Sequence, residues 1–376
     1  MAEETWTIKR CLDWTNDYLA RKGCERSRVS AEWLLTSVTG LSRIQLYTEF
    51  DRPLDSAELA RMHDAVVRRA KGEPLQYITG ETTFRTIDVA CEPGVLIPRP
   101  ETEVLVEEVL SYLDTEVLGI EGVDAPCRPR AVLPWNDLVE ERRREEEAEG
   151  EAEDPRDAEP SDRGPSDDVD LDAVTSTAAP APSPAVARVL EVGCGTGIIS
   201  LSLAAERPGR VRCVATDIEA RAVSLTKRNR AALGLSEDDV DVREGNLVSP
   251  LDRKTEWGTF DVLVSNPPYI PTDVMRELPR EVADYEPELA LAGGADGLDI
   301  FRRLLRAAPH MLRAEGLFAC ELHEDALEAA ADLARRAGLD RIEIVRDLAG
   351  RPRHLLARVP GSVADRAAKE DGRVAP

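Results

Sequence analysis

The sequence predicts an α/β protein in which a mostly parallel sheet follows a small bundle of helices. Three observations support this prediction. Helical patterning fills residues 6–71, short apolar runs alternate with helix-like segments from residue 188 onward, and an acidic stretch without either pattern separates the two. Alternating strands and helices are typical of a doubly wound parallel sheet with helices on both faces.

The first part reads as a helical domain, which we assign to residues 1–78. Its apolar residues recur with a period of 3.6, beginning with Ile8, Cys11, Leu12, Trp14, Tyr18 and Leu19. We expect Ser30 to cap a helix over 31–39 that ends at Gly40, and Ser56 to cap a helix over 57–71 that ends at Gly72.

A linker, residues 79–113, should follow this domain. Alternating apolar residues predict a β-hairpin over 83–91 that turns near 92–94. Pro100 then opens a helix, because proline is favoured at the first helical position and acidic residues, here Glu101 and Glu103, in the first turn.

Residues 114–187 are expected to be a disordered insertion. Between positions 137 and 172 lie 17 acidic residues and five arginines, a net charge of −12 and half of the chain's total of −24. Low hydrophobicity with a large charge of one sign predicts disorder. A solvated spacer is favoured over an interaction segment, and residues 361–376 are expected to be a second disordered stretch.

The remaining residues, 188–360, are predicted to form the sheet. The five parallel strands are expected at 188–192, 211–216, 240–243, 260–265 and 316–322. A closing pair, 341–346 and 353–358, is joined by a short turn and should be antiparallel. In such sheets ligands bind at the carboxyl ends of the strands.

A glycine loop follows the first of these strands. Residues 189–197 read Val-Leu-Glu-Val-Gly-Cys-Gly-Thr-Gly, and a helix-like segment follows. Alternate glycines let a ligand approach the backbone, but position 198, where a dinucleotide site needs glycine, is Ile, which disfavours NAD or FAD. Asp217 ends the second strand, where an acidic side chain accepts hydrogen bonds from ribose hydroxyls.

The fourth strand ends in Asn266-Pro267-Pro268-Tyr269. Two prolines make this loop stiff and remove backbone donors, so the loop offers the oxygens of Asn266 and Pro267 to a group with N–H bonds. An aromatic side chain at Tyr269 supplies a flat wall. This combination suits an amino or amide nitrogen held in place while it attacks an electrophile.

Together these motifs resemble those of class I S-adenosylmethionine-dependent methyltransferases, which have a Rossmann-like sheet. Residues 72–80 and 96–103, with 285–291 and 293–298, are more narrowly similar to the release-factor glutamine methyltransferase family (HemK/PrmC). The resemblance covers residues 1–113 and 188–360. It implies transfer of a methyl group from S-adenosylmethionine to N5 of the glutamine in the Gly-Gly-Gln motif of peptide chain release factors, with the helical domain docking that protein.

The resemblance also implies the site residues. Asn266, Pro267 and Tyr269 would be catalytic, and Pro268 would join them in binding the substrate amide. Arg99 and Glu101 are expected to close over the cofactor or position the substrate. The expected cofactor-binding residues are Glu191, Gly193, Cys194, Gly195, Thr196, Gly197, Asp217, Asn246, Leu247 and Asn266. The chain departs from the family at position 246, where an acid is common, and after Glu321, where glycine is usual.

The composition of the chain narrows the classes of protein and the functions that its sequence fits. The seven scattered cysteines include no Cys-x-x-Cys pair, which argues against zinc and disulfides and for a reducing cytoplasm. No apolar run approaches the roughly 20 residues of a membrane span, and no signal peptide is apparent. A DNA or RNA amino-methyltransferase stays possible but would want a basic face, which this acidic chain lacks. A non-catalytic protein that binds S-adenosylmethionine is the other alternative.

Overall fold

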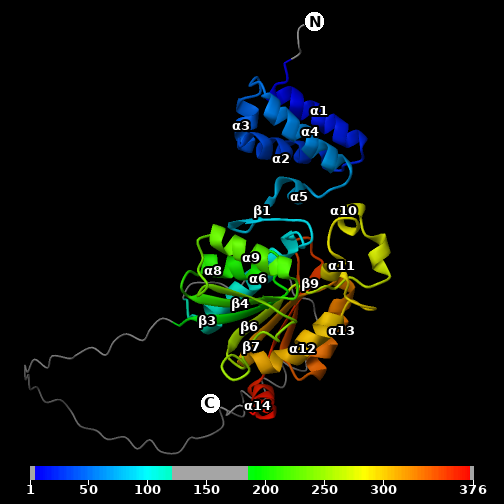
Figure 1. The fold of residues 1–376 in the computed structure, drawn as a ribbon. Helices are drawn as coiled ribbons and strands as arrows, with labels where there is room; N and C mark the ends of the chain where they lie inside the picture. Colours follow the sequence, from blue (N-terminus) through cyan, green and yellow to red (C-terminus); the bar gives the residue numbers. More distant parts are fainter. Residues whose placement is uncertain (1–4, 121–184, 373–376) are drawn as a thin grey trace, which may run out of the picture.

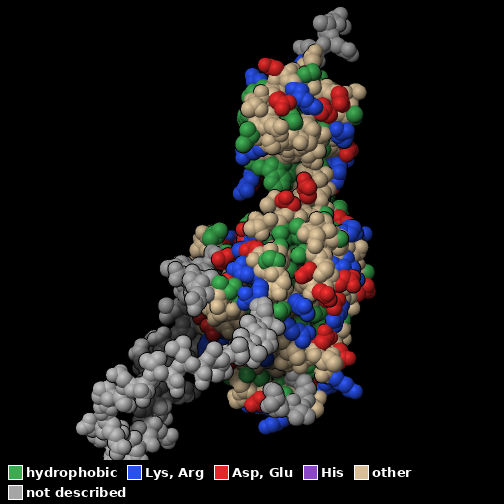
Figure 2. Space-filling model, turned by 90° about the vertical axis from the view of Figure 1, so that its left-hand side faces the viewer, with side chains coloured by type: hydrophobic (Ala, Val, Ile, Leu, Met, Phe, Trp, Pro, Cys, Tyr) green, Lys and Arg blue, Asp and Glu red, His purple; other side chains and the backbone are tan. Residues whose placement is uncertain are grey.

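A computed structural model describes residues 5–120 and 185–372, which form a small helical domain above a larger α/β domain (Figure 1). A narrow waist joins the two parts in the space-filling view (Figure 2). The predicted insertion 114–187 falls mainly on residues outside the described ranges. None of the described helices combines the length and apolar character that crossing a bilayer requires.

The helical domain has its own hydrophobic core. It consists of α1 (Ile8–Arg21), α2 (Ser27–Thr39), α3 (Arg43–Thr48), α4 (Ser56–Ala70) and α5 (Leu75–Thr79). Two predicted caps were wrong. Helix α2 begins before Ser30, which is buried inside it, and Asp55 caps α4 by accepting a hydrogen bond of 2.7 Å from the Glu58 backbone N–H.

The linker contains a hairpin of β1 (Glu81–Phe84) and β2 (Ile87–Ala90), followed by α6 (Pro100–Tyr112). The predicted turn near 92–94 was wrong, because the chain reverses at Arg85, which has a φ of 50°. No glycine or asparagine marks this turn in the sequence. An ion pair of 2.7 Å between Arg85 and Glu206 anchors it to the α/β domain instead.

The sheet has seven strands in the order β5-β4-β3-β6-β7-β9-β8. The first five are parallel and β9 is antiparallel to both of its neighbours, which confirms the predicted fold class. The strands are β3 (Ala187–Val192), β4 (Val211–Asp217), β5 (Val240–Glu244), β6 (Phe260–Ser265), β7 (Leu312–Glu321), β8 (Asp340–Arg346) and β9 (Pro352–Arg358).

Helices cover both faces of the sheet (Figure 1). On one face α6, α8 (Ile198–Glu206) and α9 (Ala220–Ala232) pack against the strands. On the other face lie α12 (Asp299–Met311) and α13 (Leu327–Arg336). The strand order reverses between β3 and β6, whose carboxyl ends therefore border a crevice, the usual place for a ligand.

A long connection from β6 to α12 rises beside the helical domain. It contains η2 (Val274–Glu277), α10 (Arg280–Ala283) and α11 (Glu288–Leu291). Arg69 of α4 forms an ion pair of 3.1 Å with Glu281, and the Tyr285 hydroxyl donates a hydrogen bond of 3.3 Å to the Lys71 carbonyl. The connection therefore contacts the helical domain as well as the crevice.

Two segments expected to be disordered are folded in part. One helical turn, η1 (Leu113–Val117), continues α6, and α14 (Gly361–Glu370) follows β9. Ala367 of α14 is buried, and Asp371, just beyond α14, pairs with His310 at 2.8 Å and with Arg253 at 2.8 Å. The weak apolar pattern of α14 hid this helix, because alanine contributes little to a hydrophobic face. The predicted domain boundaries stay predictions.

Candidate active site

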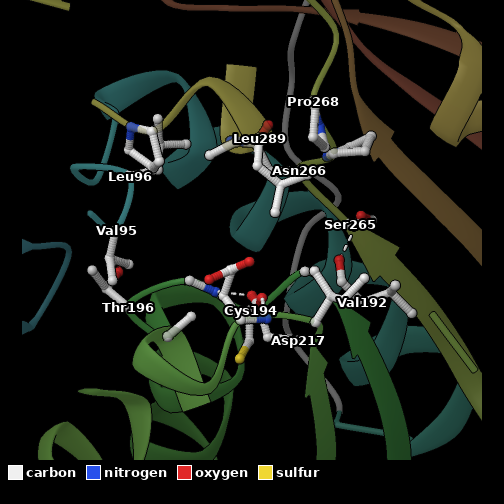
Figure 3. A pocket seen from close by; sticks show the side chains of 18 of the residues that line it. Val95, Leu96, Val192, Cys194, Thr196, Asp217, Ser265, Asn266, Pro268 and Leu289 are labelled. Atoms are coloured by element: carbon white, nitrogen blue, oxygen red, sulfur yellow. Dashed lines mark hydrogen bonds between the residues drawn. The ribbon is translucent and has the colours of Figure 1, made fainter. Parts of the chain in front are cut away.

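A cavity of about 490 Å³ opens at the carboxyl ends of β3, β4 and β6 (Figure 3). The glycine loop and Asp217 lie on one side of it, and Asn266, Pro268 and Leu289 lie on the other. The linker adds Leu96 and its neighbours to the wall. Segments distant in the sequence thus surround one space, as the strand-end rule predicts.

The cavity brings together most of the residues predicted for the site. Its walls include Glu191, Gly193, Cys194, Gly195, Thr196, Asp217, Asn246, Leu247, Asn266, Pro267 and Pro268. Two predicted site residues, Gly197 and Tyr269, are not among the lining residues. The roles of all these residues in binding and catalysis stay predictions.

Gly197 supports the loop from behind. It has a φ of +85° and precedes α8, and a Cβ at this position would lie 2.6 Å from Cγ2 of Thr226. Any other residue would push α9 away from the loop. We therefore regard Gly197 as a residue that shapes the glycine loop rather than one that touches a ligand.

Glu191 is buried beneath the same loop. One of its carboxylate oxygens accepts a hydrogen bond of 2.9 Å from the backbone N–H of Ser200. Burial raises the pKa of Glu191 to about 8. A cation entering this side of the cavity would favour the ionised form, because opposite charges stabilise each other at low dielectric.

Asp217 has hydrogen-bonding capacity left for a ligand. Its two oxygens accept hydrogen bonds of 2.9 Å each, from the backbone N–H groups of Gly195 and Glu219. These bonds fix the carboxylate against the glycine loop (Figure 3). Each oxygen keeps a second lone pair, which suits a pair of neighbouring hydroxyl groups.

Asn246 and Leu247 lie at the end of β5. The side-chain oxygen of Asn246 accepts a hydrogen bond of 2.9 Å from the guanidinium of Arg303, which also lines the cavity. Leu247 has a φ of 53°, which is strained for a residue other than glycine. Strain of this kind persists where surrounding structure enforces it, and it often marks a binding site.

Asn266 is half-buried and is linked by hydrogen bonds to two buried polar side chains. Its Nδ2 donates a hydrogen bond of 3.1 Å to Oγ1 of Thr102, which in turn donates one of 2.7 Å to Glu321. Thr102 and Glu321 are both fully buried. The side-chain oxygen of Asn266 takes no part in these hydrogen bonds.

Tyr269 contacts Glu321 and is not among the residues that line the cavity. Its hydroxyl donates a hydrogen bond of 3.2 Å to the second oxygen of Glu321. The prediction that Tyr269 lines the pocket therefore misplaced its ring. The glycines at 293 and 297 explain the tight fit of this loop, since a Cβ on Gly293 would lie 2.7 Å from Cα of Tyr269, and one on Gly297 would lie 2.3 Å from the Tyr269 carbonyl oxygen.

The two linker residues expected near the ligand differ. Arg99 lines the cavity and forms an ion pair of 2.5 Å with the buried Glu286, which ties the β6–α12 connection to the linker. Glu101 is not a lining residue and instead pairs with Arg351 at 3.2 Å. The two residues are only two positions apart at the start of α6, so their side chains point in different directions.

The described walls of the cavity contain no histidine and no reactive thiolate. Burial beside Glu191 and Asp217 raises the pKa of the Cys194 thiol well above its usual range. The thiol is therefore neutral. Within residues 5–120 and 185–372, no cluster of His, Cys, Asp and Glu could hold a metal ion.

Sequence reasoning missed Thr102 and gave Glu321 no role in the site. Glu321 ends β7, so the strand-end rule applied to the fifth strand would have placed it near the crevice. Thr102 carried no such signal, because a threonine in the first turn of a helix is ordinary. Only the packing of α6 against the sheet reveals it.

Two protein-family models match the chain. The PrmC N-terminal domain matches residues 10–80, and the methyltransferase small domain matches residues 172–277. These ranges include most of the helical domain and the glycine loop, Asp217 and Asn266.

Curated relatives match nearly the whole chain. A release factor glutamine methyltransferase of Geobacter sulfurreducens is 35% identical over 89% of this chain and 90% of its own length. One from Moorella thermoacetica is also 35% identical, over 93% of this chain and 98% of its own. Among solved structures, a methyltransferase from Pyrococcus furiosus covers 46% of this chain and 76% of its own, with 22% identity and a TM-score of 0.35.

Proposed function

Since the chain belongs to the release factor glutamine methyltransferase family, we propose that it transfers a methyl group from S-adenosylmethionine to a glutamine side chain of peptide chain release factors. The acceptor is N5 of the glutamine in the Gly-Gly-Gln motif. The observation that carries this proposal is the position of Asn266, whose free oxygen lies at the cavity wall opposite the glycine loop.

The lining residues fit S-adenosylmethionine. Asp217 has two acceptor oxygens for the ribose hydroxyls, and the backbone of Gly193 and Gly195 leaves room for the methionine portion. Apolar walls, including Leu247, suit the adenine. Buried Glu191 can balance part of the positive charge. When bound, this molecule supplies an electrophilic methyl group on a sulfonium.

The protein's task is to make an amide nitrogen attack. An amide is a poor nucleophile, because its lone pair is delocalised into the carbonyl. The Asn266 oxygen and the Pro267 carbonyl would accept hydrogen bonds from the two N–H groups and so orient the nitrogen for attack, an effect worth several kcal/mol and up to about 7–11. Bound S-adenosylmethionine would supply the methyl group and keep its sulfur as a neutral thioether, and the methylated nitrogen would then release its proton to water.

Two further elements of the proposal concern the partner and its compartment. The helical domain docks the release factor, since it stands beside the connection that borders the cavity (Figure 1). Six of the cysteines are free thiols in the described residues, which suits a reducing cytoplasm where translation takes place.

Substitution Asn266→Ala tests the catalytic proposal. Loss of a hydrogen bond made to the reacting group should lower kcat by roughly 10²–10³-fold, while the affinity for S-adenosylmethionine stays nearly unchanged. The assay follows labelled methyl transfer to a purified release factor, and calorimetry measures cofactor binding. A variant that transfers methyl at the wild-type rate would refute the role of Asn266.

The acceptor itself is tested by incubating the protein with labelled S-adenosylmethionine and a bacterial lysate. Mass spectrometry should find the label on the glutamine of a release factor. Label on DNA or RNA would support the nucleic-acid alternative. Cofactor binding without any labelled product would support a binding protein.

A further inference from the structure

The hydrogen bonds behind Asn266 have a direction that bears on the proposed reaction. Thr102 has one hydroxyl proton, and it donates that proton to Glu321 at 2.7 Å. Tyr269 donates its own proton to the other oxygen of the same carboxylate, at 3.2 Å. Both hydroxyl protons therefore point toward the oxygens of Glu321, which accept these hydrogen bonds.

This direction fixes which end of the Asn266 amide faces Thr102. With its proton committed to Glu321, the Thr102 hydroxyl can offer Asn266 only lone pairs. Asn266 must therefore present its NH₂ group, which it does at 3.1 Å. The Asn266 oxygen is left to face the substrate.

We propose that Thr102 is a positioning residue, which acts through Asn266 by holding its amide in the orientation that accepts the substrate N–H. A reversed Asn266 would present NH₂ to the NH₂ group of the substrate, and two donors repel. This inference rests on the proposed function and adds a residue that touches Asn266 rather than the substrate itself.

The surroundings make the arrangement rigid. Thr102 and Glu321 are fully buried, so no bulk water competes for these bonds. Thr102 lies in the first turn of α6, which begins at Pro100, and its own N–H donates to the Arg99 carbonyl at 3.1 Å. His354 faces Glu321 across the β7–β9 pair, with 3.8 Å between Nε2 and a carboxylate oxygen.

The test compares Thr102→Val with Thr102→Ser. Valine keeps the shape and removes the hydroxyl, so Asn266 can reverse, and we expect kcat with a release factor to fall about tenfold to a hundredfold. KM for the factor and the Kd for S-adenosylmethionine should change less than about threefold. Serine restores the hydroxyl and should return kcat to within about threefold of wild type.

A control variant and unfolding measurements distinguish a positioning role of Thr102 from a purely structural one. Thr115→Val, an exposed substitution in the turn that continues α6, should leave kcat unchanged. Thermal unfolding of each variant shows whether it is folded at the assay temperature. If Thr102→Val is not, Thr102→Ala is measured instead, with the same expected loss of kcat.

The two proposals fail in different ways. A wild-type chain that does not methylate the release factor overturns the proposed function. If the wild-type protein methylates the release factor and a folded Thr102→Val variant has the same kcat, only the positioning role is overturned. A serine variant as slow as the valine variant also overturns it.

Discussion

At the scale of single residues, the site depends on a few buried or half-buried polar groups whose partners are fixed. Asp217 is held by two backbone N–H groups, Glu191 by one, and Asn266 by Thr102. Each keeps lone pairs for a ligand. Buried polar groups that are fully paired rigidify a site, whereas a lost partner costs more than the bond itself contributes.

Asp217→Ala should weaken binding of S-adenosylmethionine about tenfold to a hundredfold. The substitution removes hydrogen bonds to a charged acceptor, each worth about 1.5–3 kcal/mol. Calorimetry measures the affinity. Glu237→Ala, at a side chain that is 83% exposed, is the control and should bind normally. Unchanged affinity in the Asp217 variant would exclude the ribose contact.

Glu191 should make the stability of the ligand-free protein depend on pH. Its pKa is about 8 in the folded chain and lower when unfolded, so between these values the folded state binds more protons. The free energy of unfolding therefore falls as pH rises through this window, by at most about 1.4 kcal/mol per pH unit, and levels off above pH 8.

The comparison that isolates this group is wild type against Glu191→Gln. Urea unfolding at pH 6 and pH 8 should show a smaller decrease for the variant, since glutamine can still accept from Ser200 but does not titrate. Parallel pH profiles for the two proteins would show that Glu191 does not carry a raised pKa.

At the scale of elements, short segments decide how the sheet and the cavity are completed. Helix α14 packs against β7 and α12, and the β6–α12 connection is braced by the ion pair of Arg99 with Glu286. Neither role follows from local sequence. Helix α14 is hard to recognise in the sequence, because its buried face consists mainly of small residues such as Ala367 and shows no strong apolar pattern.

Ala367→Asp should destabilise the protein by more than about 2 kcal/mol. The residue is 4% exposed, and burying an unpaired charge is costly. Ser362→Asp, an exposed change in the first turn of the same helix, should alter stability by less than about 0.5 kcal/mol. Urea unfolding measures both, and equal stability of the two variants would mean that α14 does not pack as described.

At the scale of the whole molecule, the insertion leaves and re-enters the α/β domain at one place. Arg210 donates to the Leu118 carbonyl at 3.0 Å and to the Ala185 carbonyl at 3.1 Å, so one guanidinium contacts both flanks. Strand β3 starts nearby at Ala187, and the cavity lies past its other end, after Val192. The described flanks of the insertion therefore lie at the end of the sheet opposite the candidate active site.

Deleting residues 125–180 should leave methyl transfer within about twofold of wild type. The eight residues that stay can span roughly 25 Å, more than the neighbouring flanks require. A second variant, in which a Gly/Ser segment of equal length replaces 125–180, separates the effect of charge from that of length. Weaker binding of the release factor by both variants would show that the acidic segment is an interaction site.

The positions of the strands and their parallel or antiparallel type could be predicted from the sequence, and so could the residues at their carboxyl ends. Gly193, Asp217 and Asn266 were found because strand ends and loop chemistry are local properties, and a parallel sheet brings such ends together. The resemblance of the motifs supplied the reaction and the acceptor.

The tertiary structure alone decided where side chains point. It turned Tyr269 toward Glu321, directed Glu101 to Arg351, and placed Thr102 against Asn266 although 164 residues separate them. Local patterns do not contain this information, because the orientation of a side chain depends on the packing of segments that are far apart in the chain. The sequence by itself determined that these strand ends meet at one crevice, and packing determined which side chains reach it and which of their atoms face a ligand.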